Sequence, residues 1–569
     1  MAMSESALAV ARDRYFFDDE TTWEQCAERV GDYVADVEKD KNYYSEQFAD
    51  VIKNMDFLPG GRILRNARRN SGSMFNCYVL PIGDSIEEIG QFMKDALILW
   101  SEGGGVGTNL SFLRPKGAPI KGKGGLSSGP VSFLSAADGI ASTIESGGSR
   151  RAAGLGCMLV EHPDILDFMD AKTVQGALSY FNISVIVTEE FLEAVESNKD
   201  WTFKFARQDY GTIPATDIWD KIVSNMLASA EPGLLHWENM TSNNSYYFQQ
   251  IQSVNPCGEV PLGAYNVCNL GSLVLPNFIT GNVNTNWKKL ERTIKLAVRF
   301  LDDVIECNKY VLKEIDINAH NGRRIGLGVM GLAEYLFAKK MRYGSKKSIY
   351  EVERLMRFIR DVAYETSIEL AIEKGAFPKF DPVSYGKAHF IRTLPASLRM
   401  KIKEHGTRNV TLLAMAPTGT ISLISEVSSG IEPLFKKAYM RNDRIGDRMY
   451  IHPLYKNMLQ EGQVPDWFVD ADDLSPEDHL EVQVAVQKYT DSSVSKTINM
   501  PSNTTQDRLS KLLLEYVHDL KGVTIYVDGS RDNQVLNKVS EEDARKHIEE
   551  SSTKVDDDLM TCATGNCEI

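Results

Sequence analysis

Long apolar stretches are missing from this sequence. No run of about eighteen uninterrupted apolar residues occurs, so no membrane span and no membrane partner are expected. The first residues, MAMSESALAVARDRYFF, lack the positively charged leader and the apolar core of a secretion signal. We therefore expect a cytoplasmic protein.

The chain is also short of positive charge. Its 569 residues include 63 Lys and Arg against 78 Asp and Glu, which gives a formal net charge of -15. Because proteins hold nucleic-acid phosphates chiefly through clustered Lys and Arg, this balance argues against broad nucleic-acid binding. Small anionic ligands remain compatible, since a few Arg side chains and backbone N–H groups are enough to hold a phosphate.

Cysteine is too scarce for a disulfide scaffold. The chain has 8 Cys, and a large cytoplasmic protein has little use for structural disulfides. Each cysteine must therefore be explained by packing, metal binding or redox chemistry, and packing is the simplest explanation for any single one. The eight are Cys26, Cys77, Cys157, Cys257, Cys268, Cys307, Cys562 and Cys567.

The remaining composition indicates a large α/β protein. Residues 1–70 have charged helical faces and few glycines, and short apolar runs separated by Gly-rich loops follow. β-rich runs at residues 182–188, 409–415 and 522–527 alternate with longer helical runs, which predicts a largely parallel sheet or barrel. From about residue 539 the tail is polar and acidic, so we expect it to be flexible.

Two helices are predicted near the start of this α/β region. Ser85 and Glu88 have the spacing of a capping box, and apolar residues recur at helical spacing until the glycine run 103–105. A second helix, rich in Ala and Ser, is expected from about residue 130 to residue 144. Small residues permit close approach, so the two helices can pack on each other or on a second subunit.

The tail ends in a pair of cysteines, Cys562 and Cys567, in the sequence CATGNCEI. Gly565 between them lets the two sulfurs meet in a small disulfide ring. A mobile thiol pair can visit another site and exchange by thiolate attack. Metal binding is the alternative, but two Cys make only half of a zinc site. The pattern favours a redox shuttle.

A second cysteine motif is Asn255-Pro256-Cys257-Gly258-Glu259. Pro and Gly beside the cysteine suggest a tightly turned loop, and an extended conformation would project Asn255, Cys257 and Glu259 the same way. An amide can hold a ligand hydroxyl and a carboxylate can take or give its proton. A zinc site is the competing interpretation, although no His or third Cys lies nearby. The residues alone leave a catalytic role and a structural role equally open.

The string NPCGEVPL…YNVCNLGS closely resembles the active-site loop of ribonucleotide reductases, particularly the adenosylcobalamin-dependent ones. Further segments resemble this family in the family's order and extend from about Pro59 to Leu536. They are MFNCYVLPIGDSIEEI, GGGVGTNLSFLRPKGAPIKG, GGSRRAAG, RRIGLGVMGLAEYL, MAPTGTISLISEVSSGIEP and GVTIYVDGSRDNQVL. Any one could be chance, but together with the CxxxxC terminus they are highly specific.

The resemblance implies the fold and its division. We expect a helical amino-terminal region over residues 1–70 and a ten-stranded α/β barrel over residues 71–538. The cysteine loop would pass through the centre of this barrel, and effector and dimer helices would lie near residues 84–150. A flexible redox tail would follow over residues 539–569.

The resemblance also implies the chemistry of the loop. Cys257 matches the cysteine that becomes a thiyl radical and takes the 3′-hydrogen of the ribose. Glu259 matches the general base on the 3′-hydroxyl, and Asn255 matches the residue that orients the ribose hydroxyls. No protein-bound metal is implied.

Reducing electrons would come from further thiols. Cys77 and Cys268 match the pair that reduces the substrate and ends as a disulfide. Cys562 and Cys567 match the tail pair that re-reduces this disulfide and is itself reset by thioredoxin or glutaredoxin. The division is physically sensible, because a radical site must be shielded and external reductants then need a flexible intermediary.

The segment Met415–Ser422 follows a β-rich run and resembles the phosphate loop that binds the ribonucleotide substrate. Gly419 would let the backbone turn while N–H groups and Thr hydroxyls face the anion. From the residues alone, an ordinary strand-to-helix turn is equally compatible. Gly105 matches a position where the backbone must approach the substrate closely. The substrate-binding residues that the resemblance implies are Asn76, Gly105, Pro417, Thr418, Gly419, Thr420 and Ile421.

A deoxynucleotide effector is implied at the interface of a homodimer. The matching residues are Asp84, Arg114, Lys121 and Arg150, and a loop from about residue 146 to residue 156 would relay effector identity to the substrate site. Each of these charges alone is also typical of a solvated surface. The sequence leaves no room for an ATP-sensing cone domain before the helical region, so we expect no overall inhibition by dATP through such a domain.

The radical source is predicted from one position. Family members served by a separate ferritin-like metal subunit carry two adjacent tyrosines in the segment GVTIYVDGS, whereas here Tyr526 is followed by Val527. The missing tyrosine favours adenosylcobalamin as the cofactor. The alternative is a class I catalytic subunit that binds no cofactor directly and receives its radical from the partner.

More distant alternatives make different predictions. A glycyl-radical enzyme would share the barrel but need a glycyl-radical loop near the carboxyl terminus, which a CxxxxC tail does not resemble. A non-radical thiol oxidoreductase and a catalytically inactive nucleotide-binding regulator are further possibilities. A regulator would not need a thiol relay, and conversion of a ribonucleotide to its deoxy form separates the three from a reductase.

Overall fold

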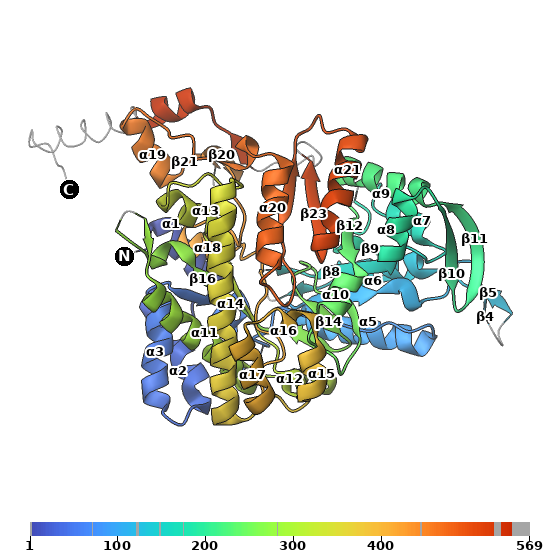
Figure 1. The fold of residues 1–569 in the computed structure, drawn as a ribbon, viewed down its shortest axis with the longest axis horizontal. Coiled ribbons are helices and arrows are strands. Elements are labelled where there is room, and N and C mark those ends of the chain that lie inside the picture. Colours follow the sequence, from blue (N-terminus) through green and yellow to red (C-terminus); the bar gives the residue numbers. More distant parts are fainter. Residues whose placement is uncertain are drawn as a thin grey trace, which may run out of the picture.

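The computed structural model describes residues 3–70, 72–120, 124–146, 150–174, 176–281, 283–443, 446–527 and 536–548. The cysteine pair of the tail lies outside these ranges. At the amino terminus, helices pack into one unit, coloured blue in Figure 1, which we call the helical unit. Its elements are α1 (Glu5–Arg14), α2 (Trp23–Val34), η1 (Ala35–Val37), α3 (Lys41–Lys53), β1 (Phe57–Pro59) and α4 (Gly61–Asn66).

Five parallel strands form the first half of a barrel. Their residues are almost all buried, as expected for parallel strands covered on both faces. In spatial order they are β2 (Cys77–Val79), β3 (Gly105–Asn109), β8 (Ala153–Leu159), β9 (Phe181–Val187) and β12 (Gly233–His236).

The second half runs antiparallel to the first and closes the ring. It consists of five segments that run parallel to one another. They are β16 (Leu270–Val274), β19 (Gly326–Met330), residues 413–415, β22 (Thr497–Met500) and β23 (Gly522–Val527). β23 pairs antiparallel with β12 on one side. On the other side β15 (Asn266–Cys268), which continues into β16 after Asn269, pairs antiparallel with β2. The ten-stranded barrel is therefore confirmed.

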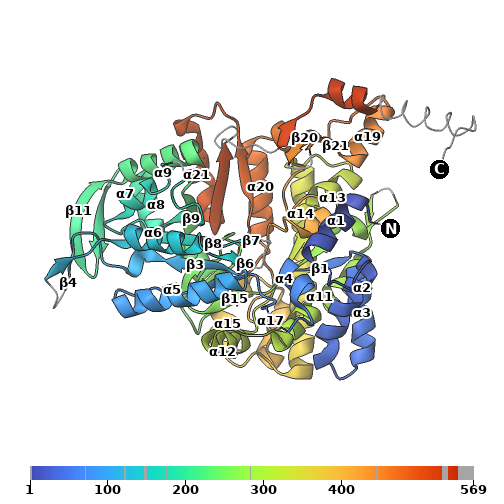
Figure 2. The same cartoon turned by 180° about the vertical axis from the view of Figure 1, so that it is seen from behind.

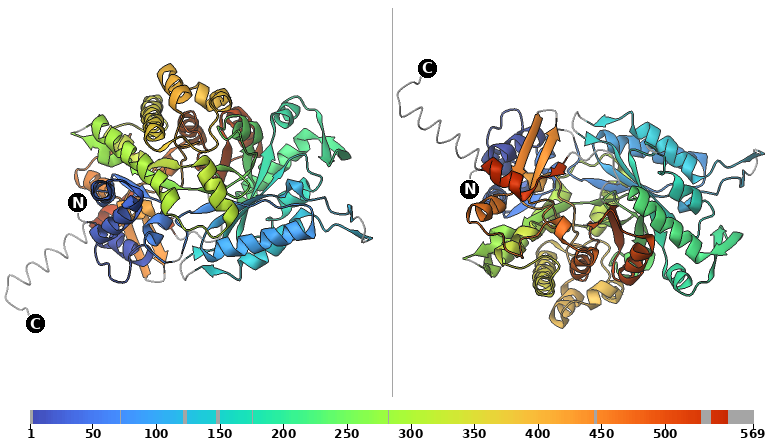
Figure 3. Two further views of the ribbon diagram at one scale, coloured as in Figure 1. Left: turned by 90° about the horizontal axis from the view of Figure 1, so that it is seen from below. Right: turned by 90° about the horizontal axis from the view of Figure 1, so that it is seen from above.

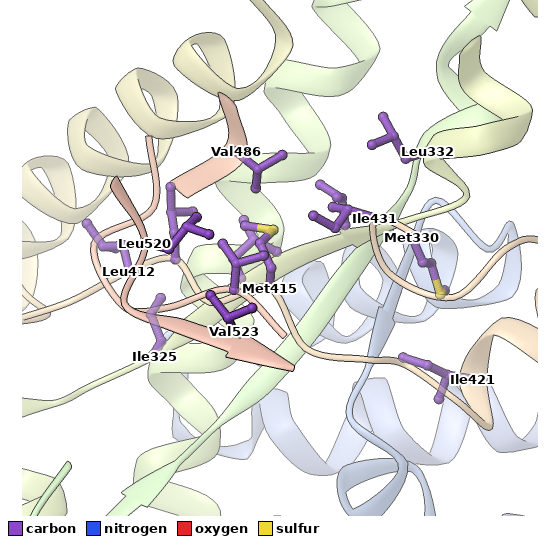
Figure 4. Packing of buried hydrophobic residues seen from close by; sticks show 14 of the residues in the cluster. Ile325, Met330, Leu332, Leu412, Met415, Ile421, Ile431, Val486, Leu520 and Val523 are labelled. Atoms are coloured by element: carbon purple, nitrogen blue, oxygen red, sulfur yellow. The ribbon is translucent and has the colours of Figure 1, made fainter. Parts of the chain in front are cut away.

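Helices cover the outside of the barrel, as the views in Figures 1, 2 and 3 show. Buried apolar side chains such as Ile325, Met415 and Val523 join the second half of the barrel to these helices (Figure 4). Around the first half lie α5 (Ile86–Ser101), α6 (Pro130–Ala141), α7 (Ile165–Asp170), α8 (Glu189–Glu196) and α9 (Ala215–Ser229). Around the second half lie α11 (Trp287–Cys307), α12 (Lys313–Gly322), α13 (Leu332–Ala338), α14 (Lys346–Lys374), α17 (Ala396–His405), α20 (Pro476–Gln487) and α21 (Gln506–Tyr516).

Smaller elements complete the fold. An exposed hairpin, β10 (Asp200–Phe205) and β11 (Gln208–Pro214), projects at one end of the molecule. A small antiparallel sheet lies near the last described residues and consists of β20 (Ala438–Asp443), β21 (Gly446–Ile451) and β24 (Leu536–Lys538). Within the described residues, no helix is both long enough and apolar enough to cross a membrane.

Most of the predicted elements are present. Ser85 caps α5 by accepting the N–H of Glu88 at 3.2 Å, and α5 ends just before the glycine run. α6 begins at Pro130 as predicted but ends at Ala141, three residues earlier than expected.

The run at residues 409–415 is not the regular strand that we predicted. Only isolated bridges at Leu413 and Met415 place it in the barrel. The buried carboxylate of Asp491 accepts the backbone N–H groups of Leu412 and Leu413 at 2.7 and 2.8 Å. The Asp491 carboxylate thus accepts the N–H groups that carbonyl groups of a neighbouring strand would accept in a regular sheet.

Candidate active site

A hairpin runs through the barrel between β12 and β15. It consists of β13 (Ile251–Val254) and β14 (Pro261–Gly263), which pair antiparallel, and we call residues 251–263 the central hairpin. It touches β3 so closely that a Cβ on Gly107 would lie 1.9 Å from the carbonyl oxygen of Val254. Asn109 Nδ2 also donates to the carbonyl of Gln252 at 2.9 Å. Glycine at 107 therefore lets the two backbones meet, as the expected central loop requires.

The tip of the central hairpin turns sharply at Cys257. Gly258 has φ +81°, a conformation that favours glycine, and its N–H donates to the carbonyl of Asn255 at 2.9 Å. Cys257 and Glu259 face one cavity, but the Asn255 side chain is fully buried and its Oδ1 accepts the N–H of Val260 at 2.9 Å. The loop is thus tightly turned, as predicted, but the turn separates Asn255 from the other two side chains, which an extended conformation would have projected the same way.

Two further thiols lie beside this tip. Cys77 on β2 and Cys268 on β15 are directly opposite each other in an antiparallel pair, and both are buried. Such opposite residues have Cα atoms about 4.5–5.5 Å apart, within the range that a disulfide bridges. Burial raises the pKa of Cys268 well above its usual value, and interactions with Cys77, Glu259 and Cys257 raise it further. The Cys268 thiol is therefore protonated at neutral pH, and Cys77 lines the same cavity as Cys257.

The larger cavity has a volume of about 440 Å³ and contains most of the predicted substrate site. Thr418 has φ +53°, and its hydroxyl accepts the N–H of Gly430 at 2.7 Å, so this side chain stabilises the loop. Gly105 does not line the cavity. A Cβ there would lie 2.9 Å from Pro256 Cγ and 3.1 Å from Cys77 Sγ, so glycine is needed for packing under the tip. Predicted residues in the lining are Asn76, Cys77, Cys257, Glu259, Pro417, Thr418, Gly419, Thr420 and Ile421.

One wall of this cavity consists of residues that the sequence did not predict to be functional. The helical unit contributes Arg14, Tyr15, Arg62 and Arg65 to the lining. No motif marked these residues, because an isolated arginine in a helical region is most often a solvated surface residue. Only the packing of the helical unit against the barrel identifies them.

A second cavity, with a volume of about 190 Å³, lies on the other side of Cys257. Its lining is mostly neutral and includes Tyr526, while Val527 is buried in the hydrophobic core. Lys496 also lines it, but its ammonium group is bound to Glu432, and burial lowers the pKa of this lysine. Among the described residues, Cys257 is the only one that lines both cavities.

Of the predicted effector residues, the structure describes the side chains of two. Arg114 Nε donates to both carboxylate oxygens of Asp84, at 3.0 and 2.9 Å, and the backbone N–H of Arg114 donates to the same group. Arg150 lies in the short strand β7 (Arg150–Arg151), and its side chain is outside the described part. Lys121 lies outside the described residues altogether.

The three cysteines to which we assigned no catalytic role, Cys26, Cys157 and Cys307, line neither cavity. Cys26 and Cys157 are buried and Cys307 is half-buried. Burial raises the pKa of each of these thiols to about 12. They are therefore protonated and unreactive at neutral pH.

The geometry defines a barrel oxidoreductase in which a central thiol lies beside a dithiol pair. Residues 75–526 match the family model described as ribonucleotide reductase, barrel domain, and residues 1–72 match ribonucleotide reductase, all-alpha domain. The chain belongs to the ribonucleotide reductase family, whose members make deoxyribonucleotides.

Similar proteins agree with this assignment. A vitamin B12-dependent ribonucleoside-diphosphate reductase of Mycobacterium tuberculosis is 36% identical over 95% of this chain and 81% of the relative. A protein of the same name from Thermoplasma acidophilum is 33% identical over 95% of this chain and 74% of the relative. A ribonucleoside-diphosphate reductase subunit alpha of Helicobacter pylori is 25% identical over 82% and 72%.

Proposed function

We propose that this chain reduces ribonucleoside diphosphates to 2′-deoxyribonucleoside diphosphates with adenosylcobalamin as its radical source. The observation that carries the proposal is the position of Cys257, which lines both cavities. A sulfur in this position can exchange a hydrogen atom with a substrate on one side and with a radical source on the other. The names of the two relatives with 36% and 33% identity support the diphosphate and the cofactor.

In the larger cavity, the Cys257 thiyl radical takes the 3′-hydrogen of the ribose while Glu259 accepts the 3′-hydroxyl proton. The 2′-hydroxyl leaves as water with a proton from the thiol pair Cys77 and Cys268. Two electrons and the second thiol hydrogen from this pair complete the reduction at C2′ and leave a disulfide. The hydrogen atom then returns from Cys257 to C3′, and Glu259 returns the proton to the 3′-oxygen. In sum, one C–OH becomes C–H, two thiols become one disulfide and one water forms.

We assign to Asn255 a hydrogen bond from its side-chain amide to a ribose hydroxyl. Its Oδ1 is used by Val260, and its Nδ2 has no hydrogen-bond partner among the described residues. An unpaired buried amide donor is costly, which favours a partner that arrives with the substrate. A small rotation of the tip would bring this donor to a ribose hydroxyl.

The smaller cavity suits the adenosyl part of the cofactor. Its walls include the apolar residues Leu234, Leu235 and Ile525, and a Cβ on Gly258 would meet no atom within 4 Å, so the space beside Cys257 is open. When bound, adenosylcobalamin supplies a radical by homolysis of its cobalt–carbon bond. We assign to this cavity, which has a volume of about 190 Å³, only the adenosyl part of the cofactor.

The alternative radical source is a ferritin-like partner that oxidises Cys257 through tyrosines. Tyr526 lines the smaller cavity, but the next residue, Val527, is 7% exposed and belongs to the hydrophobic core. A valine side chain cannot be oxidised in such a relay. This position therefore favours the cobalamin mechanism.

Turnover by the isolated chain tests the proposal. We expect deoxynucleotide formation from ribonucleoside diphosphates when adenosylcobalamin and dithiothreitol are present, and none when the cobalamin is omitted, because no other group in this proposal generates the radical. Product is measured by chromatography over all four bases. Inactivity with cobalamin, together with activity after addition of a ferritin-like subunit, would show that adenosylcobalamin is not the radical source.

External partners follow from the same mechanism. We propose that thioredoxin or glutaredoxin supplies the electrons through Cys562 and Cys567, because Cys77 and Cys268 are buried. We also propose that a deoxynucleotide effector binds near Asp84 and Arg114 at a homodimer interface. The ion pair between these residues would then present the arginine to the effector.

Replacement of both Cys562 and Cys567 by Ser should leave one turnover per chain intact. Sustained turnover with thioredoxin should be lost, because the buried dithiol pair is then inaccessible to a protein reductant. Dithiothreitol, which is small enough to enter, should restore part of it. Deoxynucleotide per chain over time measures both phases, and full thioredoxin-driven turnover by the double variant would contradict the shuttle.

A further inference from the structure

The larger cavity is enclosed by two walls of different origin. One wall is the barrel loop 417–421, and the other consists of residues from the end of α1 and from α4 of the helical unit. The second wall is strongly cationic, because Arg14, Arg62 and Arg65 all line the cavity. In a chain with a net charge of -15, this is a local reversal of sign.

The cationic wall is held in place by buried interactions. Arg29, which is 8% exposed, donates to the carbonyl oxygens of Tyr15 and Leu64 at 3.1 Å and of Ala67 at 2.9 Å. It thereby fixes the end of α1 to α4. Loss of these hydrogen bonds would leave several buried polar groups without partners, which is costly. The bonds therefore hold the wall in place.

The same wall is attached to the phosphate loop. The Ser4 hydroxyl donates to Glu426 at 2.7 Å, which joins the start of α1 to the residue that ends the short helix after this loop. At the other end, a Cβ on Gly61 would lie 3.2 Å from the Tyr15 ring, so α1 and α4 are in close contact there. These contacts connect the segments that carry the arginines to each other and to the phosphate loop.

The arginines differ in what already binds them. Arg62 donates to the carbonyl of Gly103, a contact that joins the helical unit to the barrel. Arg14 pairs with its neighbour Asp13 at 2.8 Å, and both side chains are largely solvated, which makes a weak pair that a phosphate can replace. Arg65 is half-buried beside the cavity. Guanidinium groups bind phosphate oxygens in pairs and retain their charge at any physiological pH.

We propose that Arg14 and Arg65 bind the phosphates of the substrate, so that the helical unit forms half of the substrate site. This assignment rests on the proposed function, because it takes the larger cavity as the nucleotide site. The multiply charged diphosphate lies between the loop 417–421 and the arginines. The ribose then extends toward Cys257 and Glu259 at the other end of the same cavity.

Steady-state kinetics on the full chain with adenosylcobalamin test the assignment. Arg14→Ala and Arg65→Ala should each raise KM for a ribonucleoside diphosphate by about tenfold or more, and the double variant by more than either, because a charge-assisted hydrogen bond contributes about 1.5–3 kcal/mol. Arg65→Lys should recover part of the loss. Arg12→Ala is the matched control, since Arg12 is exposed on the same helix and is absent from the cavity lining.

Inorganic pyrophosphate separates phosphate binding from a structural effect. It should inhibit the unchanged protein competitively, and its inhibition constant should rise in the double variant by a factor similar to that for KM. An unchanged KM and an unchanged inhibition constant, in variants that melt at the same temperature as the unchanged protein, would overturn the assignment. The proposed function would survive that result, whereas it fails if the unchanged protein reduces no ribonucleotide.

Discussion

Cys257→Ser is expected to abolish even the first turnover. A hydroxyl O–H bond is much stronger than a thiol S–H bond, so serine cannot form the radical that takes the 3′-hydrogen. Deoxynucleotide should fall by at least about a thousandfold, which corresponds to about 4 kcal/mol in the barrier. The measurement is product per chain in a single turnover with prereduced protein and no external reductant.

The matched control for this variant is Cys307→Ser. Cys307 is half-buried at the end of α11 and lines neither cavity, so this change should leave single-turnover product near the level of the unchanged protein. Both variants should bind a ribonucleoside diphosphate with ordinary affinity, because neither removes a phosphate contact. Product formation by Cys257→Ser would contradict the role of this sulfur.

Gly107→Val is expected to displace the central hairpin. The added Cβ would lie 1.9 Å from the carbonyl oxygen of Val254, a contact with backbone that no side-chain rotation can relieve. We expect a loss of about 1–3 kcal/mol or more in the free energy of unfolding, which is typical of overpacking. Because the hairpin carries Cys257, turnover should fall by at least a hundredfold even in the fraction that remains folded.

Thermal or urea unfolding measures the first effect and single-turnover product measures the second. Gly386→Ala is a suitable control, since a Cβ at this exposed helical position would meet no atom within 4 Å. It should be neutral or slightly stabilising. Normal turnover and stability in Gly107→Val would show that the hairpin does not rest on β3 as described.

The sequence predicted the elements whose signals are local. Ser85 caps a helix because its hydroxyl accepts an N–H three residues later, and β23 begins and ends at the predicted residues. The orientation of Asn255 could not be predicted, because it depends on the turn at Gly258 and on the N–H of Val260. Local pattern sufficed for these two elements, whereas the side-chain orientation at the turn required the three-dimensional structure.

Two other differences depend on residues distant in sequence. The strand expected at residues 409–415 is irregular because Asp491, far along the chain, binds its backbone N–H groups. The cationic wall could not be predicted because Arg14 and Arg65 approach the phosphate loop only through tertiary packing. Resemblance to a family predicted residues that the structure brings together around one cavity, but it pointed to no residue of the helical unit in that lining.

The position of Cys257 between the two cavities makes the protein modular. Among the described residues, the linings share this one residue, so a substitution at any other lining position removes no side chain from the second cavity. The side of the radical source and the side of the substrate can therefore be altered by different substitutions. Over evolution, the device that oxidises the sulfur can be exchanged while the nucleotide side is inherited intact.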